Sequence, residues 1–295
     1  MFVVWYDRRR GVGGAHRVGQ ETTTGMCNLS SAVVTADGLR WRQDRDGMPI
    51  DPADRSKQRL AAGGTAFVST DANGLGLEVR DDDESVDLAF EGFYHPVPVW
   101  NSPEAEAVAQ TIAPNHAESS GRARGLWGSA TRSSTLMRSI TATTRGGPRL
   151  VDHHQPPLVC RNRWSASVVF GHRATGAGVP VDPRWRDSRR RKSRAGRILD
   201  IVPLVEADGV SHRGGTAVWN LPSGESLTMR CTTTDGMIFR QKDFVLIETI
   251  CEVRLDDSHD VGFCNLEMSN GIGRRKVSQA LRAVAVNGLP RRPRR

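Results

Sequence analysis

The stretch Asn-His-Ala-Glu-Ser-Ser at residues 115–120 brings several proton-handling side chains close together in the chain. An imidazole and a carboxyl group can act as acid or base, and the amide of Asn115 can orient a substrate. Residues two positions apart share one face of a strand, so His116 and Glu118 are expected side by side at a strand start. The stretch therefore indicates acid–base catalysis, or else a hydrogen-bonded strand start with no catalytic role.

Four other polar residues in the β-rich parts of the chain could play a similar part, and they are His95, His212, Glu248 and Glu267. A few polar side chains at the mouth of an apolar pocket can fix the orientation of a ligand. We expect these four to line a substrate pocket, with hydrogen-bonded structural positions as the alternative.

The glycine-rich stretch at residues 11–19 has the composition of a phosphate-binding loop without its context. Such a loop needs a strand before it and a helix after it, because the amides of the helix N-terminus bind the phosphate. Residues 20–31 carry no helical pattern. We therefore expect these glycines to connect strands, and we expect no nucleotide or other cofactor.

Asp152, His153 and His154 have the composition of a metal site. Adjacent residues of a strand point to opposite faces and seldom share one ion, so we expect no metal here. His259 lies between two cysteines, but their spacing is not that of a zinc site. Reduced thiols, mostly buried, are expected for the five cysteines. They are Cys27, Cys160, Cys231, Cys251 and Cys264.

Most of the chain has the residue pattern of β-strands, and these strands would position the candidate residues. Residues 85–93 alternate Val86, Leu88 and Phe90 with polar or small residues, the period of a half-buried strand. Turn residues separate further strands over 200–221, 226–234, 243–255 and 261–269.

One helix is expected at residues 101–114, where Ser102 caps, Pro103 fits the first helical position and Pro114 ends it. Many short strands with one short helix predict an all-β class, with antiparallel barrel or sandwich units. No apolar run is long enough to span a membrane, and a cytoplasmic location is expected.

The block at residues 126–197 breaks this pattern. Residues 121–197 hold 16 Arg and one Lys against three Asp and no Glu, although the whole chain has a net charge of only +8. One interpretation is a basic insert that binds nucleic acid through charge. Its basic runs lack the interleaved aromatic residues that stack bases, so no specific nucleic-acid partner is expected. We expect irregular or disordered backbone across the block.

Several stretches outside this block resemble a family of bacterial proteins distantly similar to hydroxyneurosporene synthase, the acyclic carotenoid hydratase. They include CNLSSAVVTADGLRWR at residues 27–42, VDLAFEGFYHPV at 86–97 and NHAESSGRARG at 115–125. The resemblance resumes at residues 200–227 and 262–269. It implies two lipocalin-like units, one at residues 1–125 and one at 198–270, followed by a basic tail at 271–295.

The family carries a signature of the form HRDHSWGPRDWW in its centre, and this chain lacks that string. Ile140 to Gly146 can be written ATC ACC GCG ACC ACT CGT GGG, which read two bases later encodes His-Arg-Asp-His-Ser-Trp. Our hypothesis is that the central block is a frameshifted translation, in which single-base deletions have moved the signature out of frame.

The resemblance implies a hydrophobic substrate, such as a terpenoid, steroid or lipid, and an acid–base reaction without a cofactor. Hydration, isomerisation and cyclisation are the candidate reactions. Because the signature's Asp–His pair is missing, this chain is expected to be a degraded or mistranslated and inactive member. A non-catalytic carrier of an apolar ligand and a basic nucleic-acid-binding protein are the alternatives.

Overall fold

The computed structural model divides into two compact units, one formed by Met1–Val97 with Ala117–Gly147 and the other by Pro98–His116 with Pro148–Arg295. Within them the structure describes residues 1–36, 40–56, 58–70, 74–92, 97–98, 117–130, 132–146, 158–163, 167–173, 184–187, 192–195, 197–205, 212–221, 223–241, 244–256 and 261–270.

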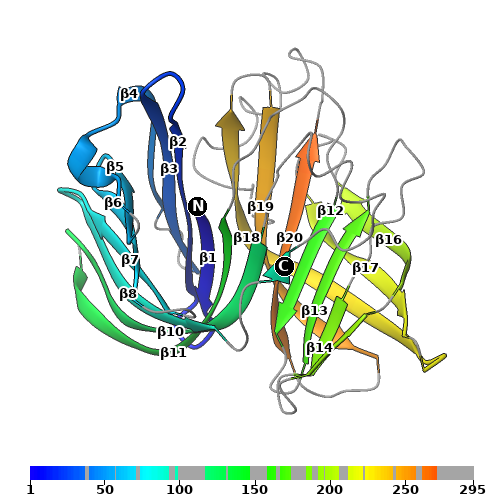
Figure 1. The fold of residues 1–295 in the computed structure, drawn as a ribbon. Helices are drawn as coiled ribbons and strands as arrows, with labels where there is room; N and C mark the ends of the chain where they lie inside the picture. Colours follow the sequence, from blue (N-terminus) through cyan, green and yellow to red (C-terminus); the bar gives the residue numbers. More distant parts are fainter. Residues whose placement is uncertain are drawn as a thin grey trace. The chain divides into compact units, whose positions relative to one another are not determined.

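The first unit is an antiparallel sheet (Figure 1). Along the sheet the order is β4-β3-β2-β1-β11-β10-β8-β7-β6-β5, and β9 pairs with β10. The strands are β1 (Phe2–Asp7), β2 (Val12–Glu21), β3 (Met26–Thr35), β4 (Arg40–Pro49), β5 (Arg59–Ala62), β6 (Thr65–Ser69), β7 (Gly74–Arg80), β8 (Glu84–Gly92), β9 (Val97–Pro98), β10 (Ala117–Ser129) and β11 (Arg132–Gly146).

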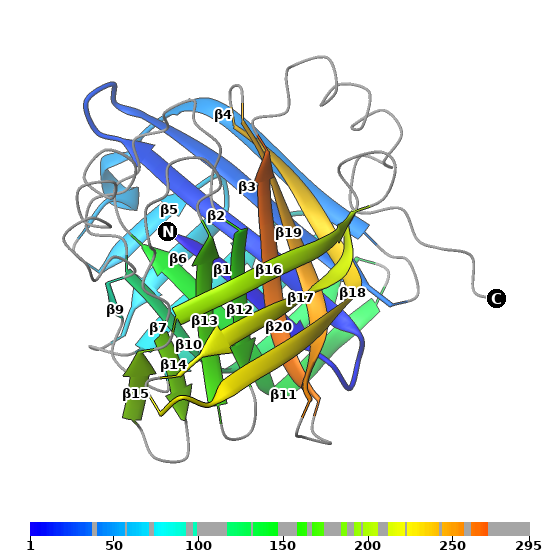
Figure 2. The ribbon, with the colours of Figure 1, turned by 90° about the vertical axis from the view of Figure 1, so that its right-hand side faces the viewer.

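The second unit repeats this topology in a sheet with the order β15-β14-β13-β12-β20-β19-β18-β17-β16 (Figure 2). In both sheets the first four strands form a meander, and the first strand pairs with the last strand of the unit. The strands are β12 (Leu158–Arg163), β13 (Ser167–Arg173), β14 (Arg184–Asp187), β15 (Lys192–Ala195), β16 (Arg197–Val205), β17 (His212–Asn220), β18 (Ser226–Gln241), β19 (Phe244–Leu255) and β20 (Gly262–Asn270).

The sequence-based expectation for residues 126–197 needs correction where the structure describes this block. The end of β10 and all of β11 to β15 lie there, so these segments are strands and not irregular backbone. A ladder of backbone hydrogen bonds can form whatever side chains a strand carries, which is why side-chain pattern missed these strands. The remaining residues of the block, and the helix expected at residues 101–114, lie outside the described residues.

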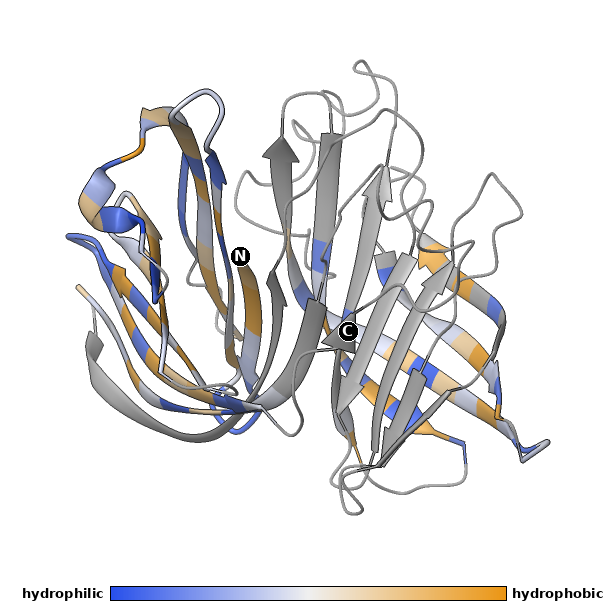
Figure 3. Cartoon of the chain, viewed as in Figure 1, coloured by the Kyte–Doolittle hydropathy of each residue, from blue (hydrophilic) through white to orange (hydrophobic). Residues whose placement is uncertain are grey.

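Alternating burial builds the core of the first unit. In β8, Val86, Leu88 and Phe90 are buried whereas Asp87 and Glu91 are exposed, which confirms the alternation expected from the sequence. Hydrophobic and hydrophilic residues alternate along other strands of this unit as well (Figure 3). The resulting apolar cluster draws on β1, β2, β3, β5, β6, β7, β8 and β10, so strands from both ends of the sheet bury residues in one core.

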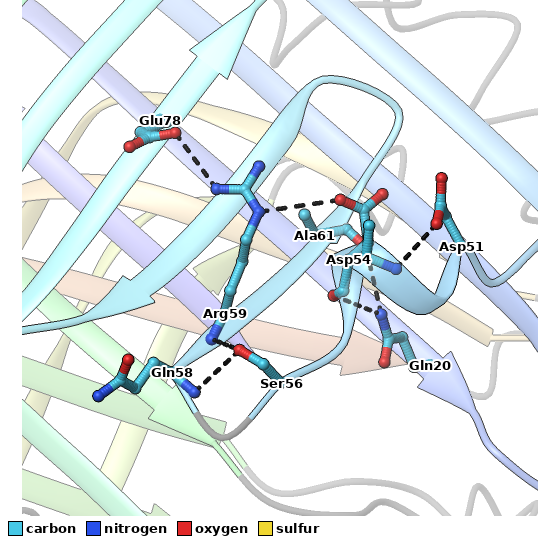
Figure 4. A network of polar contacts seen from close by, with 9 residues as sticks. Gln20, Asp51, Asp54, Ser56, Gln58, Arg59, Ala61 and Glu78 are labelled. Atoms are coloured by element: carbon cyan, nitrogen blue, oxygen red, sulfur yellow. Dashed lines mark hydrogen bonds and ion pairs between the residues drawn. The ribbon is translucent and has the colours of Figure 1, made fainter.

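A short 3-10 turn, η1 (Pro52–Asp54), connects β4 to β5, the strands at the two ends of this sheet (Figure 4). The side chain of Gln20 in β2 donates to the carbonyl oxygens of Asp54 and Ala61, each at 3.2 Å. These bonds hold β5 against β2, so the end of the sheet lies over its beginning. The ion pair of Arg59 with Glu78 at 3.4 Å is part exposed and contributes little. Among the described residues, no helix has the length and apolar character needed to cross a membrane.

Candidate functional site

The strand β19 is covered on both of its faces. Because side chains alternate along a strand, Thr249, Cys251 and Val253 share one face and Glu248 and Ile250 share the other. All five are buried, with at most 1% of any of them exposed. The face of Glu248 therefore buries a carboxyl group inside the protein.

The face of Cys251 is apolar apart from hydroxyl groups. Cys251 lies opposite Thr233 in β18, and the threonine hydroxyl contacts its sulfur at 3.5 Å. In the neighbouring strands, Trp219 lies opposite Leu227 and Ala217 opposite Met229. These four residues are buried, and they make this side the apolar face of the second sheet.

A β-bulge in β18 changes which residues share the face of Glu248. Thr233 lies opposite Cys251, but the next pair in the register is Asp235 with Ile250, so Thr234 is an extra residue. Its hydroxyl donates to the carbonyl oxygen of Ile250 at 2.8 Å. The extra residue reverses the alternation of β18 and places Asp235 on the face that carries Ile250.

Asn265 holds the carboxyl group of Glu248 on this face. Asn265 lies opposite Ile250, which makes it a diagonal neighbour of Glu248. Its side-chain Nδ2 donates to Glu248 Oε2 at 2.6 Å, and both residues are fully buried. Asn265 Oδ1 has no hydrogen-bond partner among the described residues. An unsatisfied buried acceptor is costly, so this atom is a candidate for contact with a ligand.

The structure brings two of the sequence-predicted site residues into register. Glu248 lies directly opposite Glu267 in the pairing of β19 with β20. His212 lies opposite Val205 in β17 and β16, and Glu118 lies opposite Arg145 in the first unit. The other predicted site residues, His95, Asn115 and His116, lie outside the described residues.

Sequence reasoning missed Asp235 and Asn265. An Asp-Gly pair at residues 235–236 follows directly on the expected strand at 226–234, and β18 runs on through it to Gln241. A glycine within a strand pattern is a known signal for a bulge, so Asp235 could have been found. Asn265 has no comparable signal, because only the register of β19 with β20 sets it beside Glu248.

The first unit contains a Ser-His pair that could suggest a nucleophile and its base. His16 Nδ1 lies 2.6 Å from Ser31 Oγ, and both residues are fully buried. Trp5 Nε1 donates to His16 Nε2 at 2.9 Å, with the two ring planes within 4° of each other. Thr65 Oγ1 lies 3.4 Å from Ser31 Oγ and extends this buried polar chain.

The hydrogen bond from the indole of Trp5 fixes which nitrogen of His16 carries the ring proton. Indole nitrogen can only donate, so His16 Nε2 must accept and the ring proton must sit on Nδ1. His16 then donates to Ser31 and cannot take its proton. Desolvation by burial lowers the pKa of His16 from 6.5 to about 3, which also makes it a poor base. The cluster is therefore structural.

Gly14 makes room for this cluster. A Cβ atom at Gly14 would lie 2.7 Å from both His16 Nε2 and Trp5 Nε1. The expectation that the glycines of residues 11–19 connect strands holds for Gly11, which lies in a turn with φ of +61°, whereas residues 12–19 lie inside β2. The missing side chain of Gly14 clears space beside Trp5.

Two further features bear on metal binding and on the cysteines. The described residues contain no group of three or more His, Cys, Asp or Glu side chains arranged to hold a metal ion. Cys27, Cys231 and Cys251 are buried and form no disulfide bond, which agrees with the expected thiols of the core. Cys160 and Cys264 lie in strands whose side chains are outside the described set.

Comparison with protein families matches residues 1–136 to a domain of unknown function, DUF7064. Comparison with curated proteins gives no match. The family match ends within β11, so it covers most of the first unit and none of the β18–β20 face.

Solved structures match both units. Kievitone hydratase from Nectria haematococca aligns with a TM-score of 0.61 at 8% identity, over 91% of this chain and 87% of its own. An AttH-type protein from Nitrosomonas europaea aligns with a TM-score of 0.59 at 11% identity, covering 92% and 91%. CghA aligns with a TM-score of 0.58 at 10% identity, covering 92% and 88%. The lipocalin-like all-β class expected from the sequence is confirmed at the level of fold.

Replacing Gly14 by alanine is expected to destabilise the first unit by about 1–3 kcal/mol, because the new methyl group would push Trp5 and His16 apart. Denaturant unfolding followed by near-ultraviolet circular dichroism measures this loss. Gly76→Ala is the control, since its Cβ would meet nothing closer than 3.5 Å. Equal midpoints for the two variants would contradict the proposed role of Gly14.

His16 should make the folded state sensitive to acid. Its folded pKa of about 3 lies below 6.5, so the unfolded chain binds this proton more readily between these two values. Stability contributed by neutral His16 is complete above pH 6.5 and falls as the pH drops towards 3, by up to roughly 5 kcal/mol. Urea unfolding at a series of pH values measures the slope. His16→Gln should reduce it, and an unchanged slope would refute this assignment.

Proposed function

We propose that the chain derives from a cofactor-independent acid–base enzyme that adds water to, isomerises or cyclises a hydrophobic small molecule. One observation carries the proposal, which is the fully buried carboxyl group of Glu248 held by Asn265. The fold likeness to kievitone hydratase supports it, because that protein is a hydratase by name. The resemblance to hydroxyneurosporene synthase supports a terpenoid, steroid or lipid substrate.

Glu248 is our candidate for the proton donor. Burial in general disfavours the charged form of a carboxyl group, and a neutral carboxyl can protonate a carbon–carbon double bond. The proton forms a bond to one alkene carbon, and the other carbon becomes a cation. Water then adds to this cation and loses a proton, which completes hydration. Loss of a neighbouring C–H proton gives isomerisation instead.

The nearby residues of this face suit such chemistry. Ile250 and Met237 are buried, and Met237 lies opposite Glu248. Apolar neighbours keep bulk water away from a cation, so that a single bound water competes for it. Asp235, half-buried on the same face, is a candidate for accepting the proton that this water loses. Glu267 remains a candidate for the substrate pocket because it lies opposite Glu248 in the pairing of β19 with β20.

Deuterium transfer tests the role of Glu248. The chain with its central reading frame restored is incubated in D2O with neurosporene, geraniol or kievitone, and mass spectrometry follows carbon-bound deuterium in the products. Glu248→Gln keeps an acceptor for Asn265 but removes the acidic proton, so the rate should fall roughly 10²–10⁴-fold. Glu252→Gln, a change of a less buried acid in the same strand, is the control and should retain the rate.

Two outcomes would contradict this proposal, the first its enzymatic reaction and the second the role of Glu248 as proton donor. A probe that binds in a fixed ratio without conversion would favour a non-catalytic carrier of apolar ligands. Equal rates for Glu248→Gln and the unchanged chain would show that the proton comes from elsewhere.

We further propose that residues 126–197 are translated out of frame, so that the family's Asp–His pair is lost. Resequencing the DNA across the codons for residues 125–199 tests this directly, and we expect missing single bases. Because one acid–base group contributes roughly 10²-fold or more, the restored chain should exceed the present one by that factor in the deuterium assay. An unchanged reading frame on resequencing would refute the frameshift.

A further inference from the structure

We propose that the ligand of the Glu248 face is an unsaturated alcohol, whose hydroxyl group donates a hydrogen bond to Asn265 Oδ1. This inference rests on the proposed function, since it assigns the substrate class of the same face. It goes further than the family resemblance, which implies a terpenoid, steroid or lipid without naming a polar group.

The side-chain amide of Asn265 is only partly hydrogen-bonded within the described residues. A side-chain amide has two donor hydrogens on Nδ2 and an oxygen that accepts. Nδ2 is engaged, because it donates to Glu248 Oε2 at 2.6 Å. Oδ1 is buried with the rest of the side chain and finds no donor among the described residues. Because the described residues offer no donor to this buried acceptor, a donor on a bound ligand would satisfy it.

The apolar neighbours limit what else that ligand carries. Ile250 lies directly opposite Asn265, and Met237 lies in the adjacent row opposite Glu248. Both are buried, so the ligand beside Asn265 must be mostly apolar. An apolar molecule with one hydroxyl group satisfies both the amide oxygen and these side chains.

Asn265 would thereby couple binding to chemistry. Its amide would touch the ligand hydroxyl through Oδ1 and the proposed acid through Nδ2. A hydroxyl anchored there brings a nearby double bond of the same ligand to the carboxyl group of Glu248. Asn265 is thus a positioning residue that selects alcohols whose double bond lies close to the hydroxyl.

Displacement of the fluorescent probe N-phenyl-1-naphthylamine from the full chain tests the inference without needing turnover. Geraniol and geranyl methyl ether share the same apolar chain, but only geraniol can donate a hydrogen bond. We expect geraniol to displace the probe at roughly ten- to a hundredfold lower concentration than the ether. Geranylamine is the third ligand, and tighter binding of this cation, weakened by salt, would overturn a neutral hydroxyl as the group recognised.

Two variants locate the preference. Asn265→Leu should bind geraniol and the ether alike, because the acceptor is gone. Trp219→Phe is the matched control, since Trp219 Nε1 is also buried without a hydrogen-bond partner among the described residues but lies on the apolar face of β17. This control should keep the preference for geraniol. Thermal unfolding by circular dichroism confirms that each variant is folded, and the comparison of ligands in the unchanged chain stands without any variant.

The outcomes separate this inference from the proposed function. Equal displacement by geraniol and the ether overturns the alcohol but leaves an apolar ligand and the acid–base proposal standing. Displacement by none of the three ligands overturns both. Retained preference in Asn265→Leu overturns the assignment to Asn265.

Discussion

The register of β18, β19 and β20 is the constraint on which the candidate site depends. Side chains alternate with a period of two, so a slip of one residue would move Glu248 to the opposite face. The pairing of Ile250 with Asn265 fixes the amide diagonal to the carboxyl group. The bulge at Thr234 then brings Asp235 onto the same face by adding one residue to β18. The candidate site therefore spans three strands, and it depends on the register of β19 with β18 and β20 and on the bulge in β18.

Buried polar groups differ in how completely the protein satisfies them. In the first unit, Trp5 donates to His16 and Trp127 donates to Glu84, so each buried indole of these pairs has an acceptor. In the second unit, Trp219 Nε1 and Asn265 Oδ1 have no partner among the described residues. A buried acceptor without a donor is costly, and a ligand hydroxyl at Asn265 Oδ1 would remove that cost.

The sequence predicted the elements more completely than the site. Alternation in residues such as Val86 and Leu88 reports burial locally, so β8 could be predicted from neighbouring letters alone. Glu248 could be singled out as a polar residue in an apolar stretch, but its partner could not. Asn265 is 17 residues away in the chain, and only the pairing of β19 with β20 makes the two neighbours. The strands of the central block were missed for a related reason, because backbone pairing leaves no trace in their side chains.

On the frameshift hypothesis, the central block also limits the support that the candidate site receives from its neighbouring strands. β12, from this block, pairs with β20, and its Val159 lies opposite Glu267. β11, from the same block, lies between β1 and β10 in the first sheet. Strands inside a sheet must match the alternation of their neighbours on both sides, or they carry charged side chains into buried faces. If the block is out of frame, β18 and β19 keep their evolved residues, but β20 is supported by a neighbour whose side chains were never selected. Glu248 and Asn265 can then preserve the chemistry of the site while the packing that excludes water around them is lost, which is why binding and turnover need separate measurement.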